Sequence, residues 1–164
     1  MKQGTMSVLF GCHSPIHSLL IVVSWYILYK RLPKLWEVVC IFLHDIGHIG
    51  TNYLDNIEEK NDHWIRGASI AYHLFGIEGY LLIAGHDKGS GFEESLLLKP
   101  DKYSRYIAPL WLLYFHTLVE PKLARGRNRL KDVRRFQAQV KESIESGKFR
   151  STHNLYLERE EEEN

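Results

Sequence analysis

The chain has 164 residues, of which 45% are hydrophobic and 25% are charged, and its formal net charge at pH 7 is +1. This composition excludes a disordered chain and indicates one globular domain, which we place at residues 1–157. A net charge so close to zero also excludes any argument from overall charge for binding to nucleic acid or to a membrane surface.

The first expected helix begins at Ser14, a hydroxyl N-cap, with Pro15 in the first helical position, and it runs to about Lys30. Its most apolar part, residues 19–29, is too short to span a bilayer, which needs about 20 apolar residues, so we expect a buried helix. Residues 1–11 lack the pattern of a signal peptide. The sequence therefore predicts no membrane association.

Pro33 opens a second helix in the same manner. This helix is apolar on nearly every side, so we expect it at the centre of the core, ending at Gly47. Residues 50–61 are polar and are expected to form a loop, after which Asp62 caps a third helix that ends at Gly76. The expected buried side of the third helix consists of Ile65, Ile70, Leu74 and Phe75.

The rest of the chain continues the helical pattern. The remaining expected segments are a short helix at 80–85, a glycine-rich loop at 86–91, a long apolar helix from Pro100 to Pro121, an amphipathic helix at 128–146 and a disordered acidic tail at 158–164. No segment shows a strand pattern longer than a few residues. The sequence therefore predicts an all-α fold, a single compact helical bundle.

Nine histidines are the unusual feature of this composition, and histidine is the commonest metal ligand. The pair His44–Asp45 ends an otherwise apolar helix, and a buried carboxylate is costly unless it is paired or bound to a metal. Alone, such a pair more often forms a helix cap. Further histidines and an aspartate also stand at helix ends or in adjoining loops. These residues are His17, His63, His86 and Asp101.

An antiparallel pair of helices joined at residues 31–32 would bring His17, near the start of the first helix, beside His44 at the end of the second. Such a set of imidazoles and carboxylates suits one or two divalent ions. Asp45 is the natural bridging ligand between two ions. Iron or manganese is expected, with zinc, nickel, cobalt and magnesium as alternatives.

The order of these residues resembles the HD superfamily of metal-dependent phosphohydrolases, whose pattern is a His, an adjacent His-Asp pair, further His residues and a final Asp. The resemblance covers roughly residues 14–109. The local contexts that carry it are His44-Asp45-Ile46-Gly47, His63-Trp64-Ile65-Arg66-Gly67-Ala68, the glycine-rich loop at 85–91 and Leu98-Lys99-Pro100-Asp101-Lys102-Tyr103. Together with Tyr106-Ile107-Ala108-Pro109, they are most similar to the dinucleoside-tetraphosphate hydrolase branch and related di-iron members.

The resemblance implies an HD-like helical domain that cleaves a nucleotide-type phosphoester or pyrophosphate with a metal-activated water. The implied metal ligands are His17, His44, Asp45, His63, His86 and Asp101. The expected catalytic residues are Asp45, His48 and Lys88. The family often has a lysine where this chain has His48, so His48 replaces a phosphate-binding cation or adds a ligand. Some relatives have a second histidine where Asp87 stands, and Asp87 could orient a ligand.

Four cations are candidates for binding the substrate phosphate, although each could also be a solvated surface residue. They are Arg66, Lys88, Lys102 and Arg105. Lys88 lies in the glycine-rich loop, where backbone N–H groups would assist it. Of the other histidines, His13, His73 and His153 are expected at the surface, and His116 is expected in the core, as is Cys40.

The expected partner is a small phosphorylated molecule of nucleotide type. Alternatives are a nucleotidase or deoxynucleotide triphosphohydrolase, a nucleotide-sensing module without turnover, and a nucleic-acid-directed protein that uses the basic segment 122–135. We favour a solvated helix face for that segment. Two cysteines are too few for a disulfide framework, so the expected location is the cytoplasm. A homo-oligomer is left open.

Overall fold

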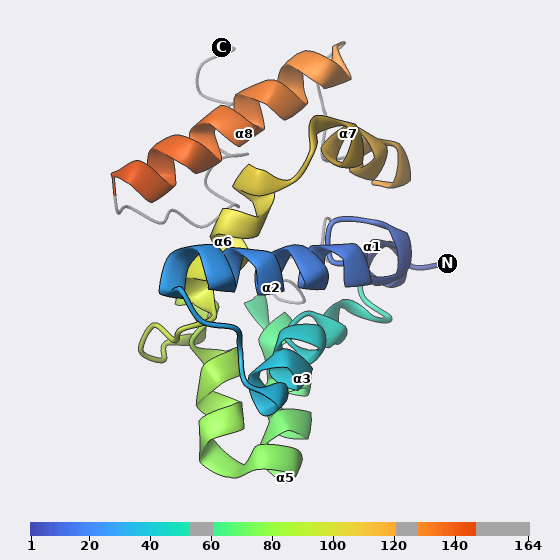
Figure 1. Ribbon diagram of the computed structural model, residues 1–164. Coiled ribbons are helices and arrows are strands. Elements are labelled where there is room, and N and C mark those ends of the chain that lie inside the picture. The colour runs from blue at the N-terminus through green and yellow to red at the C-terminus, as the bar shows by residue number, and fades with distance from the viewer. Residues whose placement is uncertain (53–60, 121–127, 147–164) are drawn as a thin grey trace.

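The computed structural model of the protein describes residues 1–52, 61–120 and 128–146, and every regular element in these ranges is a helix (Figure 1). In chain order, the elements are α1 (Gln3–Phe10), α2 (Pro15–Tyr29), α3 (Leu35–Leu43), the 3-10 helix η1 (Ile46–His48), α5 (His63–Ala84), the 3-10 helix η2 (Lys88–Ser90), α6 (Leu98–Ile107), α7 (Leu110–Val119) and α8 (Arg129–Glu145). The predicted all-α fold is confirmed for these ranges. The acidic tail at 158–164 and most of the expected loop at 50–61 lie outside them.

Helix α2 crosses the middle of the molecule, with α3 and α5 packed on one side of it and α6, α7 and α8 on the other (Figure 1). The larger hydrophobic core lies between α2, α3 and α5 and includes Ile21, Trp25 and Ile41, each 0% exposed. A smaller cluster joins Leu113 of α7 to Val133 of α8. The molecule thus consists of two packed layers that meet at α2.

Only one side of α2 is buried. Ile21 and Trp25 are fully enclosed, whereas Leu19 is 56% exposed and Tyr26 is 55% exposed. The prediction of a buried helix is therefore correct for that side alone. By length and composition α5 is the one helix among the described residues that could cross a membrane by itself, and α1 with α2 qualifies only as a pair bent by 54°. Core helices of soluble proteins meet the same criterion, and α5 packs against α3.

The start of α3 is fixed by Glu37, which is why the helix begins at Leu35 rather than at Pro33. The Glu37 carboxylate accepts a hydrogen bond from the backbone N–H of Lys34 at 2.6 Å, and it pairs with both guanidinium nitrogens of Arg31 at 2.7 and 2.8 Å. These bonds satisfy a free N–H group at the helix start. The helix then ends at Leu43, four residues earlier than predicted, so His44 stands at its C-terminus.

The predicted buried side of α5 is partly correct. Phe75 packs against the core and Ile70 is half-buried, whereas Ile65 is 43% exposed and Leu74 is 58% exposed. Where α5 approaches α3 the buried residues are small, because a Cβ atom at Gly67 would collide with the carbonyl oxygen of Leu43. The buried residues of α5 are Trp64, Gly67, Ala68, Ala71, Gly79, Leu82, Ile83 and Ala84.

Two interruptions of the helical backbone, at Gly76 and before Pro109, set the directions of the later helices. At Gly76 the backbone has φ 68°, a left-handed conformation that favours glycine, and α5 bends there into two limbs. The predicted helix end at Gly76 and the separate helix at 80–85 agree with this bend. The single helix predicted from Pro100 to Pro121 is wrong: Pro109 divides it into α6 and α7. Ala108 is extended (ψ 131°), because a following proline disfavours the helical conformation.

Candidate metal centre

Three helices bring the first group of predicted ligands together. His17 lies in the first turn of α2, His44 caps the end of α3, and Asp101 lies in the first turn of α6. The Nε2 atom of His17 is 3.0 Å from Oδ1 of Asp101, and Nε2 of His44 is 2.9 Å from Oδ2 of Asp45. The antiparallel arrangement of α2 and α3 places His17 and His44 at one end of the pair, as the sequence predicts.

The second group depends on the bend in α5, whose two limbs run back alongside each other (Figure 1). His63 begins the first limb and His86 follows the second, and their Nε2 atoms are 3.2 Å apart although 23 residues separate them in sequence. In a straight helix that separation would span about 35 Å. His63 Nε2 also lies 3.8 Å from Oδ1 of Asp45, so Asp45 stands between the two groups.

Three of the imidazoles are oriented by their outer nitrogen. His44 Nδ1 lies 2.6 Å from the carbonyl oxygen of Ile41, and His86 Nδ1 lies 2.5 Å from that of Ile83. The Ser104 hydroxyl donates to the carbonyl oxygen of Asp101 at 2.6 Å and lies 3.2 Å from Nδ1 of His17. Because Nδ1 is engaged in each ring, Nε2 is left to face the centre, an orientation typical of metal-binding histidines. Nε2 of His17 and that of His44 each face a carboxylate, and Nε2 of His86 faces Nε2 of His63.

The carboxylates are deeply buried and yet ionised. Burial acts to raise the pKa of Asp45, but His44 and His13 outweigh burial and hold that pKa well below its usual value. Burial likewise acts to raise the pKa of Asp101, but Lys102 and His17 hold it well below its usual value. These carboxylates are therefore available as anionic ligands at neutral pH.

The pKa values of the histidines in the centre shift in different directions because their neighbours differ. Burial, together with His44 and His63, lowers the pKa of His86 to about 3, and burial with His63 lowers that of His48 to about 3. Burial acts to lower the pKa of His44, but Asp45 outweighs burial and raises it. His48 and His86 are thus neutral at pH 7, the state in which imidazole binds a metal.

The ligand atoms fit a shared cation better than they fit one another. His17 Nε2, His44 Nε2, Asp45 Oδ2 and Asp101 Oδ1 make no hydrogen bond of normal geometry, although His and carboxylate atoms face one another at 2.9 to 3.9 Å. Two atoms that each bind one ion at about 2.1 Å lie roughly 3 to 4 Å apart. Buried His and Asp groups of this protein can therefore hold a metal ion. Among the described residues, the groups that could hold an ion are His17–His44–Asp101, His44–Asp45–His86 and His13–Asp45–His48.

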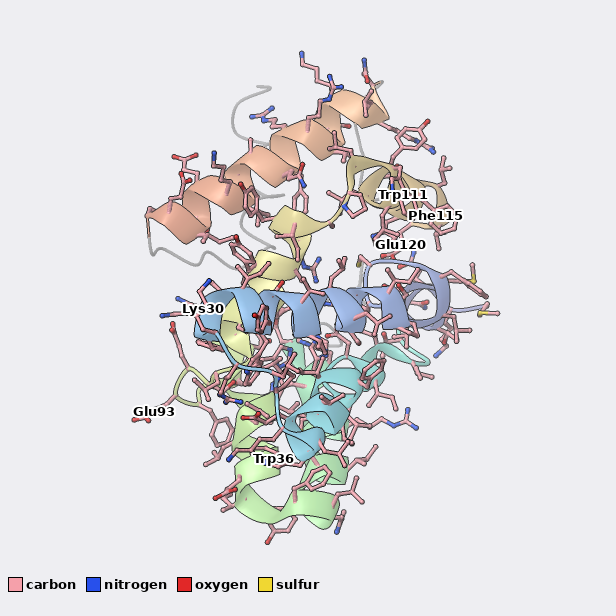
Figure 2. The ribbon with its side chains drawn as sticks, in the orientation of Figure 1. Lys30, Trp36, Glu93, Trp111, Phe115 and Glu120 are labelled. Atoms are coloured by element: carbon pink, nitrogen blue, oxygen red, sulfur yellow. The ribbon has the colours of Figure 1, made fainter. Side chains whose placement is uncertain are left out.

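His13 belongs to this centre, and the expectation that it serves the surface is wrong. Its side chain is 9% exposed, and its Nε2 lies 4.0 Å from Oδ2 of Asp45. Helix α1, which the sequence analysis did not predict, turns the chain back so that His13 covers the site. The end of α7 fixes this turn: Glu120, directed toward it in Figure 2, accepts a hydrogen bond from the Cys12 N–H at 2.7 Å. The spacing of His13 and His17, four residues apart, is the sequence signal that could have indicated it.

The four predicted phosphate-binding cations lie in different surroundings. Arg66 is exposed on α5, Lys88 pairs with Glu94 at 2.9 Å, and Lys102 pairs with Asp101 at 3.0 Å. Arg105 lines a cavity of about 50 Å³ that also includes His17 in its wall. Among the described residues, Arg105 is therefore the one of these four cations that lines a cavity next to the ligand His17.

The other predicted positions are also placed. Asp87 lies 3.8 Å from Nδ1 of His63, consistent with a ligand-orienting role. His73 is exposed as expected, whereas His153 lies outside the described residues. His116 is buried as expected but its Nε2 has no hydrogen-bond partner, so it is not a satisfied core residue. Cys40 is buried in the core as a free thiol.

Comparison with protein-family models, curated proteins and solved structures found no match for this chain. The interpretation of the site therefore depends on its own residues and geometry.

Proposed function

We propose that this protein is an HD-type metal-dependent phosphohydrolase that cleaves a nucleotide-type phosphoester or pyrophosphate. The observation that carries the proposal is the convergence of five residues from separate parts of the chain around the buried carboxylate of Asp45. Together with Asp45, and in the order of the HD pattern, the six residues are His17, His44, Asp45, His63, His86 and Asp101.

Asp45 is the residue on which this arrangement depends. Its Oδ2 faces His44 at 2.9 Å and His17 at 3.7 Å, and its Oδ1 faces His63 at 3.8 Å. With one oxygen toward each group, Asp45 would bridge two ions. When bound, the ions would supply positive charge for the phosphoryl oxygens and a water that loses its proton near neutral pH.

The donor set favours some metals over others. Four of the six proposed ligands are imidazoles, which suit iron, manganese, zinc, nickel and cobalt. Magnesium prefers an oxygen-rich octahedral site. We therefore propose iron or manganese as the metal and place magnesium last among the alternatives.

The substrate would enter beside His17. Arg105 lies on the cavity that His17 borders, and its guanidinium is suited to a phosphate oxygen. The rest of the cavity is largely apolar, with Leu20, Leu113 and Phe136 among its lining residues. A cavity of about 50 Å³ is far smaller than a site that encloses a whole drug-sized ligand. It would therefore take only a small part of the substrate beside Arg105, and the rest of a nucleotide would lie outside it.

The test is a comparison of Asp45→Ala with Asp62→Ala in protein purified anaerobically and loaded with Fe²⁺ or Mn²⁺. Asp62 is exposed and its side chain makes no cap hydrogen bond, so it is a matched control. We expect Asp45→Ala to lose both bound metal and phosphate release from a panel of mono-, di- and triphosphate nucleotides and dinucleoside polyphosphates. An Asp45→Ala protein that keeps its metal and its rate would contradict the proposal.

One alternative rests on a particular residue. His48 stands where the HD family often has lysine, and its side chain is 3% exposed with Nε2 3.9 Å from Oδ1 of Asp45. A site so altered could bind a nucleotide without cleaving it. Tight nucleotide binding by metal-loaded protein that shows no turnover in the same panel would favour this sensing function over the hydrolase.

A further inference from the structure

Five imidazoles surround the carboxylate of Asp45, but only one is close enough for a hydrogen bond. His44 Nε2 lies 2.9 Å from the carboxylate, whereas the Nε2 atoms of the other four lie between 3.7 and 4.0 Å from it. A separation beyond about 3.5 Å is too long for a direct hydrogen bond. Two of these four Nε2 atoms have a nearer partner elsewhere: that of His17 lies 3.0 Å from Oδ1 of Asp101, and that of His63 lies 3.2 Å from Nε2 of His86. The other two, those of His13 and His48, lie at the distance from Asp45 that an intervening ion requires.

Two of these imidazoles, His13 and His48, lie outside the six residues of the HD pattern. His13 Nε2 is 4.0 Å from Oδ2 of Asp45, and His48 Nε2 is 3.9 Å from Oδ1. Their ring centroids are 4.2 Å apart, and the three ligand atoms lie within 4.8 Å of one another. We call His13, Asp45 and His48 the outer ligand group.

The outer ligand group is held by its own scaffold. The Ser7 hydroxyl lies 2.6 Å from Nδ1 of His13 and Ser7 is fully buried, so Nε2 of His13 is the nitrogen that faces Asp45. Helix α1, which carries Ser7, is tied to the segment after His48 by the bond from Gly4 N–H to the Thr51 carbonyl at 2.9 Å. The two imidazoles are thus positioned together over the same carboxylate by α1 and η1.

We propose that the outer ligand group binds an additional divalent transition-metal ion, separate from the ions held by the six residues of the HD pattern. Two imidazoles and one carboxylate are a donor set that suits Fe²⁺, Mn²⁺ or Zn²⁺ and leaves coordination positions open for water or a substrate oxygen. The imidazoles of His13 and His48 lie nearest to different oxygens of Asp45. An ion bound by both Nε2 atoms would therefore lie close to both carboxylate oxygens.

This proposal shares Asp45 with the six proposed ligands of the hydrolase centre, and it uses His48, which the sequence analysis expects to be catalytic. It predicts extra positive charge beside Asp45, and it holds whatever reaction the centre performs. An alternative is that His13 is fixed only by Ser7 and by the Cys12 thiol, whose Sγ lies 3.3 Å from Nδ1 and 3.8 Å from Nε2 of His13. His48 would then be fixed by stacking on His63, with ring centroids 4.5 Å apart and ring planes 5° from parallel. That alternative predicts no ion between the rings of His13 and His48.

The metal content of the full chain distinguishes the proposed additional ion from this alternative. We would reconstitute the wild-type protein and the variants His13→Gln, His48→Gln and His73→Gln with Mn²⁺ and measure bound manganese by mass spectrometry. His73 is exposed and lies away from the centre, so it is the control. We expect each of the first two variants to lose one equivalent of manganese and His73→Gln to lose none. Wild-type content in both His13→Gln and His48→Gln would overturn the proposal.

A crystal of the wild-type protein soaked in Mn²⁺ gives a second test that no misfolded variant can obscure. We expect an anomalous-scattering peak about 2.2 Å from Nε2 of both His13 and His48. Peaks confined to the vicinity of His17 and Asp101 would overturn the proposal. The outcome is separate from the hydrolase assay, because loss of turnover in Asp45→Ala and the absence of a peak at the outer ligand group are independent observations.

Discussion

The hydroxyl of Ser104 is expected to set the metal affinity of His17. Ser104 is 0% exposed, and its Oγ lies 3.2 Å from Nδ1 of His17 while it donates to the Asp101 carbonyl at 2.6 Å. For Nε2 of His17 to bind a cation, Nδ1 must carry the proton and donate it to this hydroxyl. Ser104 therefore supports two proposed ligands at once.

The change Ser104→Ala removes this acceptor and leaves a buried N–H group unsatisfied, which costs about 1 to 3 kcal/mol. Loss of such a supporting hydrogen bond weakens metal binding by about 10- to 100-fold, and the two magnitudes agree. We expect the dissociation constant for Mn²⁺ to rise by this factor.

The assay is a Mn²⁺ titration in competition with a chelator, with Ser69→Ala as the control because Ser69 is exposed on α5. Chemical unfolding in excess chelator would report any general loss of stability in Ser104→Ala. An unchanged Mn²⁺ affinity in a folded Ser104→Ala protein would refute the role of this hydroxyl, and with it the assignment of Nε2 of His17 as a ligand atom.

Three further predictions concern Gly76, His116 and Arg105. Gly76→Ala places a side chain at φ 68° and should lower the free energy of unfolding by about 1 to 2 kcal/mol. Gly89→Ala, in the exposed loop, is the control, and equal urea midpoints for Gly76→Ala and the wild type would contradict this prediction. Burial lowers the pKa of His116 to about 4, so the unfolded state, with a His pKa near 6.5, binds more protons and stability falls as pH drops. His116 alone contributes about 2 kcal/mol to the loss of stability between pH 7 and pH 5, and the other buried histidines of the chelator-treated protein add to that loss. In urea unfolding at pH 7 and pH 5, His116→Asn should therefore lose about 2 kcal/mol less than the wild type; an equal loss would contradict this. Arg105→Ala should raise KM roughly 10- to 100-fold without loss of bound metal. Arg134 is exposed on α8, so Arg134→Ala is the control and should leave KM unchanged. Equal KM values for Arg105→Ala and the wild type would exclude Arg105 from the substrate site.

The helices that begin at strong local signals were predictable from sequence. Pro15 fixes the start of α2 and Gly76 marks the bend in α5, because a proline and a glycine act on their immediate backbone. Ser14 stands at the predicted N-cap position, although its side chain makes no cap hydrogen bond. The same local rules placed His17 and His44 at one end of a helix pair. Apart from His13, the residues now found around Asp45 were identified from this kind of information.

The errors have a different origin. Ile65 and Leu74 were assigned to the core because they are large and apolar, yet both are exposed. Small residues, Gly67 and Ala68 among them, are buried where α5 closely approaches α3. His13 was assigned to the surface because it precedes a helix. Its position depends on how α1 packs against η1 and α7, and that packing joins parts of the chain too distant for a local pattern to report.

The doubling back of α5 at Gly76 has a consequence for the unfolded chain. An ion bound by both His63 and His86 would act as a reversible cross-link that closes a loop of 23 residues. A covalent cross-link around a loop of that length reduces the chain entropy of the unfolded state by about 3 kcal/mol. Ion occupancy and folding of the two limbs of α5 would then be a single equilibrium. Because Ala68 and Ile83 of these limbs belong to the same core as Trp25 and Ile41, removing the ion would also weaken that core.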